Sequence, residues 1–79
     1  MAGFDSSLDK SLFEREADFE TTKIKVEIRS YNEGQPKIQL SRENLDPESG
    51  NWKWSKLGRL RKEEAQKVQE FLEEAIKEL

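Results

Sequence analysis

The sequence predicts an α+β fold in which an antiparallel β-meander of three to four strands is followed by one C-terminal α-helix. Apolar and polar residues alternate strictly in residues 23–29 and 37–41, and this period of two is typical of strands with one buried face. Residues 62–79 instead repeat apolar residues at spacings of three and four, the period of an amphipathic helix. The connections between the strands are short and rich in turn residues, which favours antiparallel pairing of neighbours.

Residues 1–18 are predicted to form a mobile acidic arm that precedes a folded domain of residues 19–79. Leu8 and Leu12 have helical spacing, which permits a short turn begun at Asp5 or Ser6. No longer periodic pattern accompanies them, and such termini are commonly poorly ordered. A second hypothesis gives the arm a role, in which its carboxylates lie over a basic face and compete with phosphate.

The two alternating segments predict a sheet with one apolar and one polar face. The apolar face carries Ile24, Val26 and Ile28 of the first strand, with Ile38 and Leu40 of the second. The polar face is mostly basic, and Tyr31 lies at its rim. Residues 31–36 form the turn between the strands, where Gly34 can take a positive φ and Pro36 cannot occupy a central strand position.

Residues 51–60 follow a turn-rich loop and contain both tryptophans of the chain. If this segment is a strand, Trp52, Trp54 and Lys56 share one side. Two interpretations stay open: a surface on which bases stack between cations, or two tryptophans that fill a small core. The sequence does not decide which face they occupy, because a bulge at Gly58 would shift the alternation.

A chain of 79 residues with 33% hydrophobic and 39% charged residues has a thin core, since so small a domain buries only about 60% of its unfolded surface. It has no cysteine or histidine, which removes disulfides and makes a zinc site very improbable. Oligomerisation is the usual remaining way to stabilise such a domain, so we expect a homodimer. We expect the helix to provide the dimer interface, through Val68, Phe71, Leu72, Ala75, Ile76 and Leu79.

The same composition argues against catalysis. Without histidine and cysteine, the commonest general base and the thiol nucleophile are missing, and the carboxylates are spread along a helix and a tail. We therefore expect no enzymatic activity, no cofactor and no metal. No apolar run is long enough to span a bilayer and no signal peptide pattern is visible, so we expect a protein that is soluble, intracellular and without a membrane partner.

The net charge of −3 hides a partition along the chain. Residues 21–62 contain ten lysines or arginines and five acids, a local charge of +5, whereas residues 1–20 and 63–79 each carry −4. Polyanions respond to the local field, so the basic middle keeps a nucleic-acid site plausible. Because +5 is modest, stacking would have to supply part of the affinity.

The order of these elements resembles the positive-cofactor-four transcriptional coactivator family. The resemblance covers about three quarters of the chain, from about Phe19 to Leu79, and lies in the order of the parts rather than in one motif. It rests on Lys25 to Tyr31, Lys37 to Arg42, Asp46-Pro47-Glu48, Lys56-Leu57-Gly58-Arg59-Leu60 and the helix that follows. It implies a curved sheet, a homodimer formed through the helices, and binding of single-stranded DNA in the cytoplasm or nucleoid of a bacterium or phage-infected cell, or in a nucleus.

Carried over residue by residue, the resemblance gives Arg29, Tyr31 and Lys56 the family's binding roles. The chain departs from the pattern at Asn44, where family members can carry an aromatic residue, and at Ser41, where a basic residue is expected and Arg42 follows one place later. Trp52 and Trp54 could replace the lost stacking.

The predicted function is therefore sequence-tolerant binding of single-stranded DNA in transcription, replication or recombination, with RNA as an open variant and transcription or replication proteins as further partners. The alternative is a protein-interaction module whose tryptophan-rich basic surface docks an acidic partner. The residues predicted to contact nucleic acid are Lys25, Arg29, Tyr31, Lys37, Arg42, Trp52, Lys53, Trp54, Lys56 and Arg59.

Overall fold

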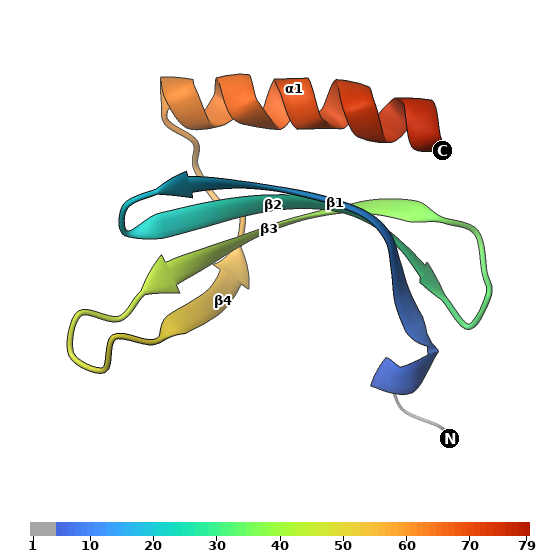
Figure 1. The fold of residues 1–79 in the computed structure, drawn as a ribbon, viewed down its shortest axis with the longest axis horizontal. Coiled ribbons are helices and arrows are strands. Elements are labelled where there is room, and N and C mark those ends of the chain that lie inside the picture. Colours follow the sequence, from blue (N-terminus) through green and yellow to red (C-terminus); the bar gives the residue numbers. More distant parts are fainter. Residues whose placement is uncertain (1–4) are drawn as a thin grey trace.

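Four antiparallel strands and one helix make up the structure, a computed structural model that describes residues 5–79 (Figure 1). The strands lie side by side in chain order, so the sheet is a simple meander, and the helix follows the last strand. This confirms the predicted α+β class and the upper number of strands. A short 3₁₀ helix, η1 (Ser6–Leu8), is followed by β1 (Asp9–Phe19), β2 (Thr22–Tyr31), β3 (Lys37–Leu45), β4 (Trp52–Lys56) and α1 (Lys62–Glu78).

The predicted acidic arm is wrong for residues 9–18, which belong to strand β1. This 11-residue strand pairs with β2 along its length, from Asp9 opposite Tyr31 to Phe19 opposite Thr22, and a bulge interrupts the register between Ser11 and Phe13. The short turn that the spacing of Leu8 and Leu12 permitted exists in part as η1, which ends at Leu8, whereas Leu12 belongs to β1. Residues 1–4 of the arm lie outside the described residues. The folded unit therefore begins well before residue 19.

Strand β2 and helix α1 form the centre of the core. Ile24, Val26 and Ile28 are at most 2% exposed, because α1 covers their face of the sheet. The side chains of Phe13, Ala17, Ile38, Leu40 and Leu72 pack around this centre and are half-buried. Burial of one such aliphatic side chain contributes about 1.5–3 kcal/mol, so the alternation of β2 is a main source of stability.

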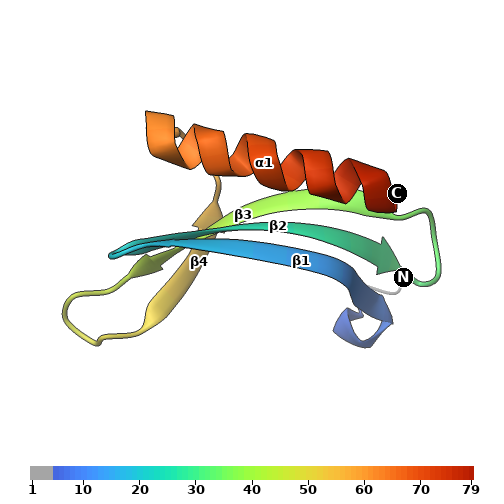
Figure 2. The same ribbon diagram turned by 45° about the horizontal axis from the view of Figure 1, so that its top comes forward.

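The sheet is arched, with α1 on its convex side and an uncovered concave face on the other (Figures 1 and 2). We call the concave face the open face. The β3–β4 hairpin and the start of β1 both bend away from the helix and form the two ends of the arch.

Three helix residues that were predicted for a dimer interface are buried inside this chain. Val68, Phe71 and Ala75 are 6%, 8% and 0% exposed and pack against the sheet. The prediction is therefore wrong for these three, because they form the row of α1 side chains that packs against the sheet. Leu72 is half-buried, whereas Ile76 and Leu79 are exposed.

Two glycines have roles that differ from those predicted. Positive φ in the β2–β3 turn is taken by Asn32 and Glu33, whereas a Cβ at Gly34 would lie 2.9 Å from the carbonyl oxygen of Tyr31. Gly58 has φ of 66° in the connection between β4 and α1, beyond the end of the strand. It therefore does not shift the alternation of β4.

A buried ion pair fixes the start of α1 on β3. The Arg42 guanidinium donates to both carboxylate oxygens of Glu64 at 3.0 and 3.3 Å, and to the carbonyls of Leu57 and Arg59 at 3.0 Å each. It also donates to the Thr22 hydroxyl at 2.9 Å. The guanidinium lowers the pKa of Glu64, although burial of that carboxylate opposes the shift.

Candidate functional site

The open face is built from alternate residues of all four strands, and the register shows which side chains share it. β2 contributes Lys23, Lys25, Glu27 and Arg29, whose neighbours on β3 are Glu43, Ser41, Gln39 and Lys37 in antiparallel register. It also contributes Tyr31, which lies opposite Asp9 of β1. β4 adds Trp52, Trp54 and Lys56 opposite Leu45, Glu43 and Ser41. The alternation that was predicted for the tryptophan segment is thus observed, on the face that α1 does not cover.

Both tryptophans lie at the β4 end of the open face. The Lys23 ammonium is 4.3 Å from the centroid of the Trp52 ring, a cation–π contact across the width of β3. Trp54 is 62% exposed and has Glu43 as its cross-strand neighbour. The interpretation of these tryptophans as core residues is therefore wrong for Trp54, while Trp52 is half-buried. We call Lys23, Leu45, Trp52 and Trp54 the aromatic corner.

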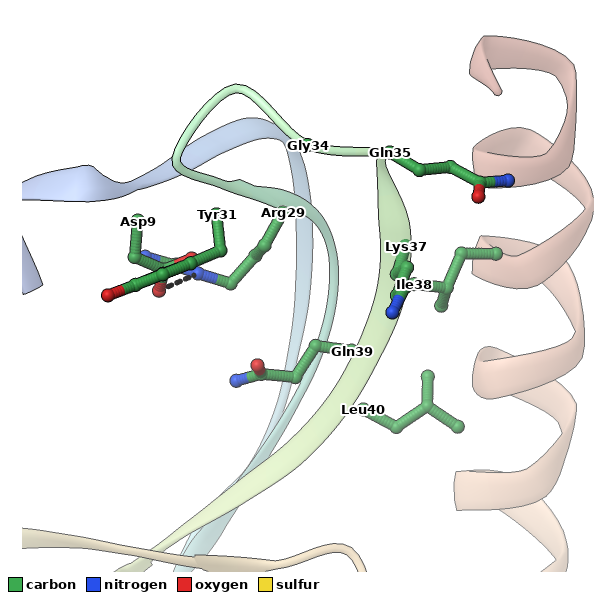
Figure 3. A pocket seen from close by; sticks show the side chains of 9 residues that line it. All are labelled: Asp9, Arg29, Tyr31, Gly34, Gln35, Lys37, Ile38, Gln39 and Leu40. Carbon is green, nitrogen blue, oxygen red and sulfur yellow. Dashed lines mark hydrogen bonds and ion pairs between the residues drawn. The ribbon is translucent and has the colours of Figure 1, made fainter. Parts of the chain in front are cut away.

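A groove of about 720 Å³ lies at the other end of the arch, along the part of β3 that β4 does not reach. In Figure 3, Gln39, Tyr31 and Arg29 point away from the helix, whereas Ile38 and Leu40 of the same strand point toward it. Tyr31 is 39% exposed, and its hydroxyl accepts a hydrogen bond from the backbone N–H of Asp5 at 2.9 Å.

Two cations in the middle of the open face are held by carboxylates. Arg29 pairs with Asp9 of β1 at 2.8 Å and with Glu27 of its own strand at 2.5 Å. Desolvation alone would lower the pKa of Arg29, but these hydrogen bonds outweigh it and raise the pKa. Lys25 lies 3.7 Å from Glu14 of β1. Within residues 5–79, Lys37 and Lys56 form no ion pair, so they are the cations of this face most open to an anionic ligand.

Seven of the ten residues predicted to contact nucleic acid share the open face, and three do not. Arg42 lies on the helix side, and its donors are used by Glu64, Thr22 and two loop carbonyls, so its predicted contact with nucleic acid is wrong. Lys53 alternates to the side opposite the tryptophans and pairs with Asp46 at 3.1 Å. Arg59 lies in the connection to α1, outside the sheet. The seven are Lys25, Arg29, Tyr31, Lys37, Trp52, Trp54 and Lys56.

Three features of the site were not predicted as such. Lys23 was not assigned to the site, although it contacts Trp52. The acids of β1 were assigned to an arm, although Asp9, Glu14, Glu16 and Asp18 alternate onto the open face. The inward position of Arg42 has a signal in the sequence, because it continues the alternation of Ile38 and Leu40 by two residues.

Comparison of the chain with protein-family models found no match, and neither did comparison with curated proteins or with solved structures. The resemblance to the coactivator family therefore stays an interpretation of the sequence. Among residues 5–79, no helix is long and apolar enough to cross a membrane. Over the same range, no cluster of three or more His, Cys, Asp or Glu side chains could hold a metal ion.

Proposed function

We propose that the protein binds single-stranded nucleic acid, DNA in the first instance, on the open face, with bases stacked at the aromatic corner. The observation that carries this proposal is the position of Trp54, 62% exposed beside Trp52 on the uncovered side of an arched sheet. An exposed tryptophan next to lysines is what base stacking with phosphate contacts requires, and stacking contributes about 1–3 kcal/mol per base without reading its identity. Such a protein would hold melted strands in transcription, replication or recombination.

The ligand would lie on the β3–β4 side of the open face, between Lys37 and the aromatic corner. Lys37 and Lys56 flank this path on β3 and β4, and Gln39 and Ser41 lie between them. The cations nearer β1 are engaged by carboxylates, which leaves the β3–β4 side as the more favourable half for phosphate. Tyr31 at the groove offers a second ring for stacking.

We also propose that the protein is a homodimer, joined along the flank of α1 that faces β3. Glu74, on the opposite flank, pairs with Arg15 of β1 at 3.4 Å, so Leu72, Ile76 and Leu79 are directed toward the β3 side. Ile38 and Leu40 point toward the helix there and are only half-buried (Figure 3). Ile76 and Leu79 are 61% and 59% exposed, and a second copy would cover this apolar flank.

A fluorescence titration with single-stranded oligonucleotides tests the proposal, because both tryptophans belong to the site. Quenching by an unlabelled oligonucleotide should be strong in the wild type and should weaken as salt is raised. Trp54→Ala should lower the affinity about 5- to 150-fold, the loss of one stacked base. A parallel titration with an RNA of the same sequence decides whether the ribose matters.

A matched pair of lysine variants on one strand provides the control. Lys56→Ala, on the open face, should weaken binding and reduce its salt dependence, whereas Lys53→Ala, on the opposite side, should leave both unchanged. If the folded wild-type protein shows no quenching at low salt, the proposal is contradicted. That outcome favours the protein-interaction hypothesis, in which Trp54 anchors a partner.

A further inference from the structure

A row of acidic side chains runs along the β1 margin of the open face. The register places Asp9, Glu14, Glu16 and Asp18 on this face, while the basic residues of β1, Lys10 and Arg15, alternate to the other side. Glu14, Glu16 and Asp18 are exposed and follow one another at every second position of the strand. We call these three residues the acidic edge.

The acidic edge lies on the same face of the sheet as the proposed ligand, at the opposite margin from β4. Strands are spaced about 4.8 Å apart, so β1 lies roughly 10–15 Å from β3 and β4. There, Lys37 and Lys56 form no ion pair with any of the described residues, 5–79. This separation is comparable to the Debye length of about 10 Å at 0.1 M salt, so the carboxylates still act on a phosphate placed over β2. Phosphate over β1 itself would meet them directly.

The β3–β4 half of the open face is wide enough for one nucleic-acid backbone but not for two. A single strand can follow β3 and β4 with its phosphates at Lys37 and Lys56. A duplex has a second backbone across a groove about 6 or 12 Å wide, and on this face that backbone would lie over β2 or β1. There it would encounter the acidic edge. Of the β2 cations that could compensate, Lys25 and Arg29 are already paired with Glu14, Asp9 and Glu27, and Lys23 lies over the Trp52 ring.

We propose that the acidic edge is a specificity device that excludes duplexes and confines the ligand to one strand on the β3–β4 half of the sheet. The inference rests on the proposed function and deepens it, since it assigns discrimination to strand β1, far from the stacking residues. The carboxylates act by repulsion, so they need no contact with the ligand that binds.

The test is neutralisation of the acidic edge by Glu14→Gln, Glu16→Gln and Asp18→Asn in one variant. Affinities for an oligonucleotide and for its blunt duplex are measured by anisotropy of a labelled strand at 0.1 M salt. We expect duplex affinity to rise about tenfold and single-strand affinity to rise much less, because the repulsion falls on the second backbone. This difference in affinity should disappear near 1 M salt, where the Debye length is about 3 Å. A difference caused by an altered conformation of the variant would persist at that salt concentration.

A matched control variant distinguishes the effect of where the carboxylates lie from the effect of the change in the protein's net charge. Glu63→Gln, Glu73→Gln and Glu78→Gln add the same charge on exposed sites of α1, on the convex side. This variant should leave the ratio of single-strand to duplex affinity unchanged. Equal gains in the two variants, or an unchanged ratio in the edge variant with its fold intact by circular dichroism, would overturn the inference alone. A wild type that binds neither ligand would overturn the proposed function and, with it, the inference.

Discussion

Arginines of similar appearance in the sequence have opposite roles in the structure. Arg42 and Arg29 both lie in strands. Arg42 is half-buried on the helix side and donates five hydrogen bonds to protein groups, whereas Arg29 lies on the open face and pairs with two carboxylates. The guanidinium of Arg42 presents its donors in a rigid fork that a lysine could not reproduce. Arg42 therefore stabilises the fold and does not belong to the candidate site.

Removal of Arg42 should destabilise the protein severely. Arg42→Ala leaves the Glu64 carboxylate, whose side chain is 3% exposed, without its partner, and breaking a buried pair in this way costs about 3–5 kcal/mol. Urea unfolding followed by circular dichroism measures the loss. Lys37→Ala, at an exposed position, should change the free energy of unfolding by no more than about 0.5 kcal/mol. The double variant Arg42→Met with Glu64→Leu should recover part of the loss, and failure to do so would contradict the ion-pair account.

Glu64 also gives the stability a specific dependence on pH. Its pKa is lower in the folded protein than the ordinary value of 4.5, because Arg42 and the Arg61 N–H hydrogen-bond to the ionised form. The contribution is therefore complete above about pH 4.5 and is lost as the pH falls through the lowered folded-state pKa. The carboxyl carbon of Glu64, followed by NMR, should titrate below 4.5. A midpoint at or above that value would contradict the lowered pKa.

At the scale of the elements, patterns of strict alternation predicted the strands that carry the core, and a broken pattern concealed β1. β2 alternates without error, and its inward residues are at most 2% exposed. In β1 the bulge after Ser11 leaves Leu12 57% exposed, and the inward position between Phe13 and Ala17 is filled by Arg15. Arg15 is tolerated there because it stacks over Phe13 at 4.3 Å and pairs with Glu74 of α1, partners that a sequence pattern does not reveal.

The same limit applies to the candidate site. Alternation placed Trp52, Trp54 and Lys56 on one side of a strand, but the side on which α1 packs depends on contacts that are distant in sequence. The register of β1 with β2 decides which cations are paired, and β1 was not predicted as a strand. The sequence pattern therefore predicted the stacking candidates on β4 and missed the acidic edge on β1, at the opposite margin of the sheet.

The exposed flank of α1 predicts how a dimer can be broken without loss of the fold. Ile76→Glu introduces a charge at a position that is 61% exposed in the single chain, so the monomer should fold normally. In a dimer joined along this flank, the buried charge should shift the equilibrium toward monomer, as measured by analytical ultracentrifugation. Gln66→Glu adds the same charge on the outward side of the helix and should leave assembly unchanged. A wild type that stays monomeric at high micromolar concentration would contradict the proposed dimer.

At the scale of the whole molecule, charge is distributed so that electrostatics alone cannot give tight binding. The net charge is −3, and the open face brings its cations next to acids of β1 and β2. Lys37 and Lys56 are outside the ion pairs of residues 5–79, and Lys23 is held over the Trp52 ring. In the proposed binding mode, the rings would therefore supply much of the free energy of binding, and the lysines would mainly position the nucleic-acid backbone.

This balance predicts a shallow salt dependence. If Lys23, Lys37 and Lys56 each contact a phosphate, the slope of log Kobs against log salt is about −2 for a single strand bound to one chain. It is about −4 for a dimer in which the open faces of both chains bind. Lys37→Ala should make the slope less negative by about 0.7 per chain, whereas Trp54→Ala should lower affinity at every salt concentration and leave the slope unchanged. A wild-type slope near −7 would mean that about ten phosphates are contacted. The paired cations Lys25 and Arg29 would then have to leave their carboxylates on binding. In that case nucleic acid would reach β1, and the acidic edge would not exclude a second backbone.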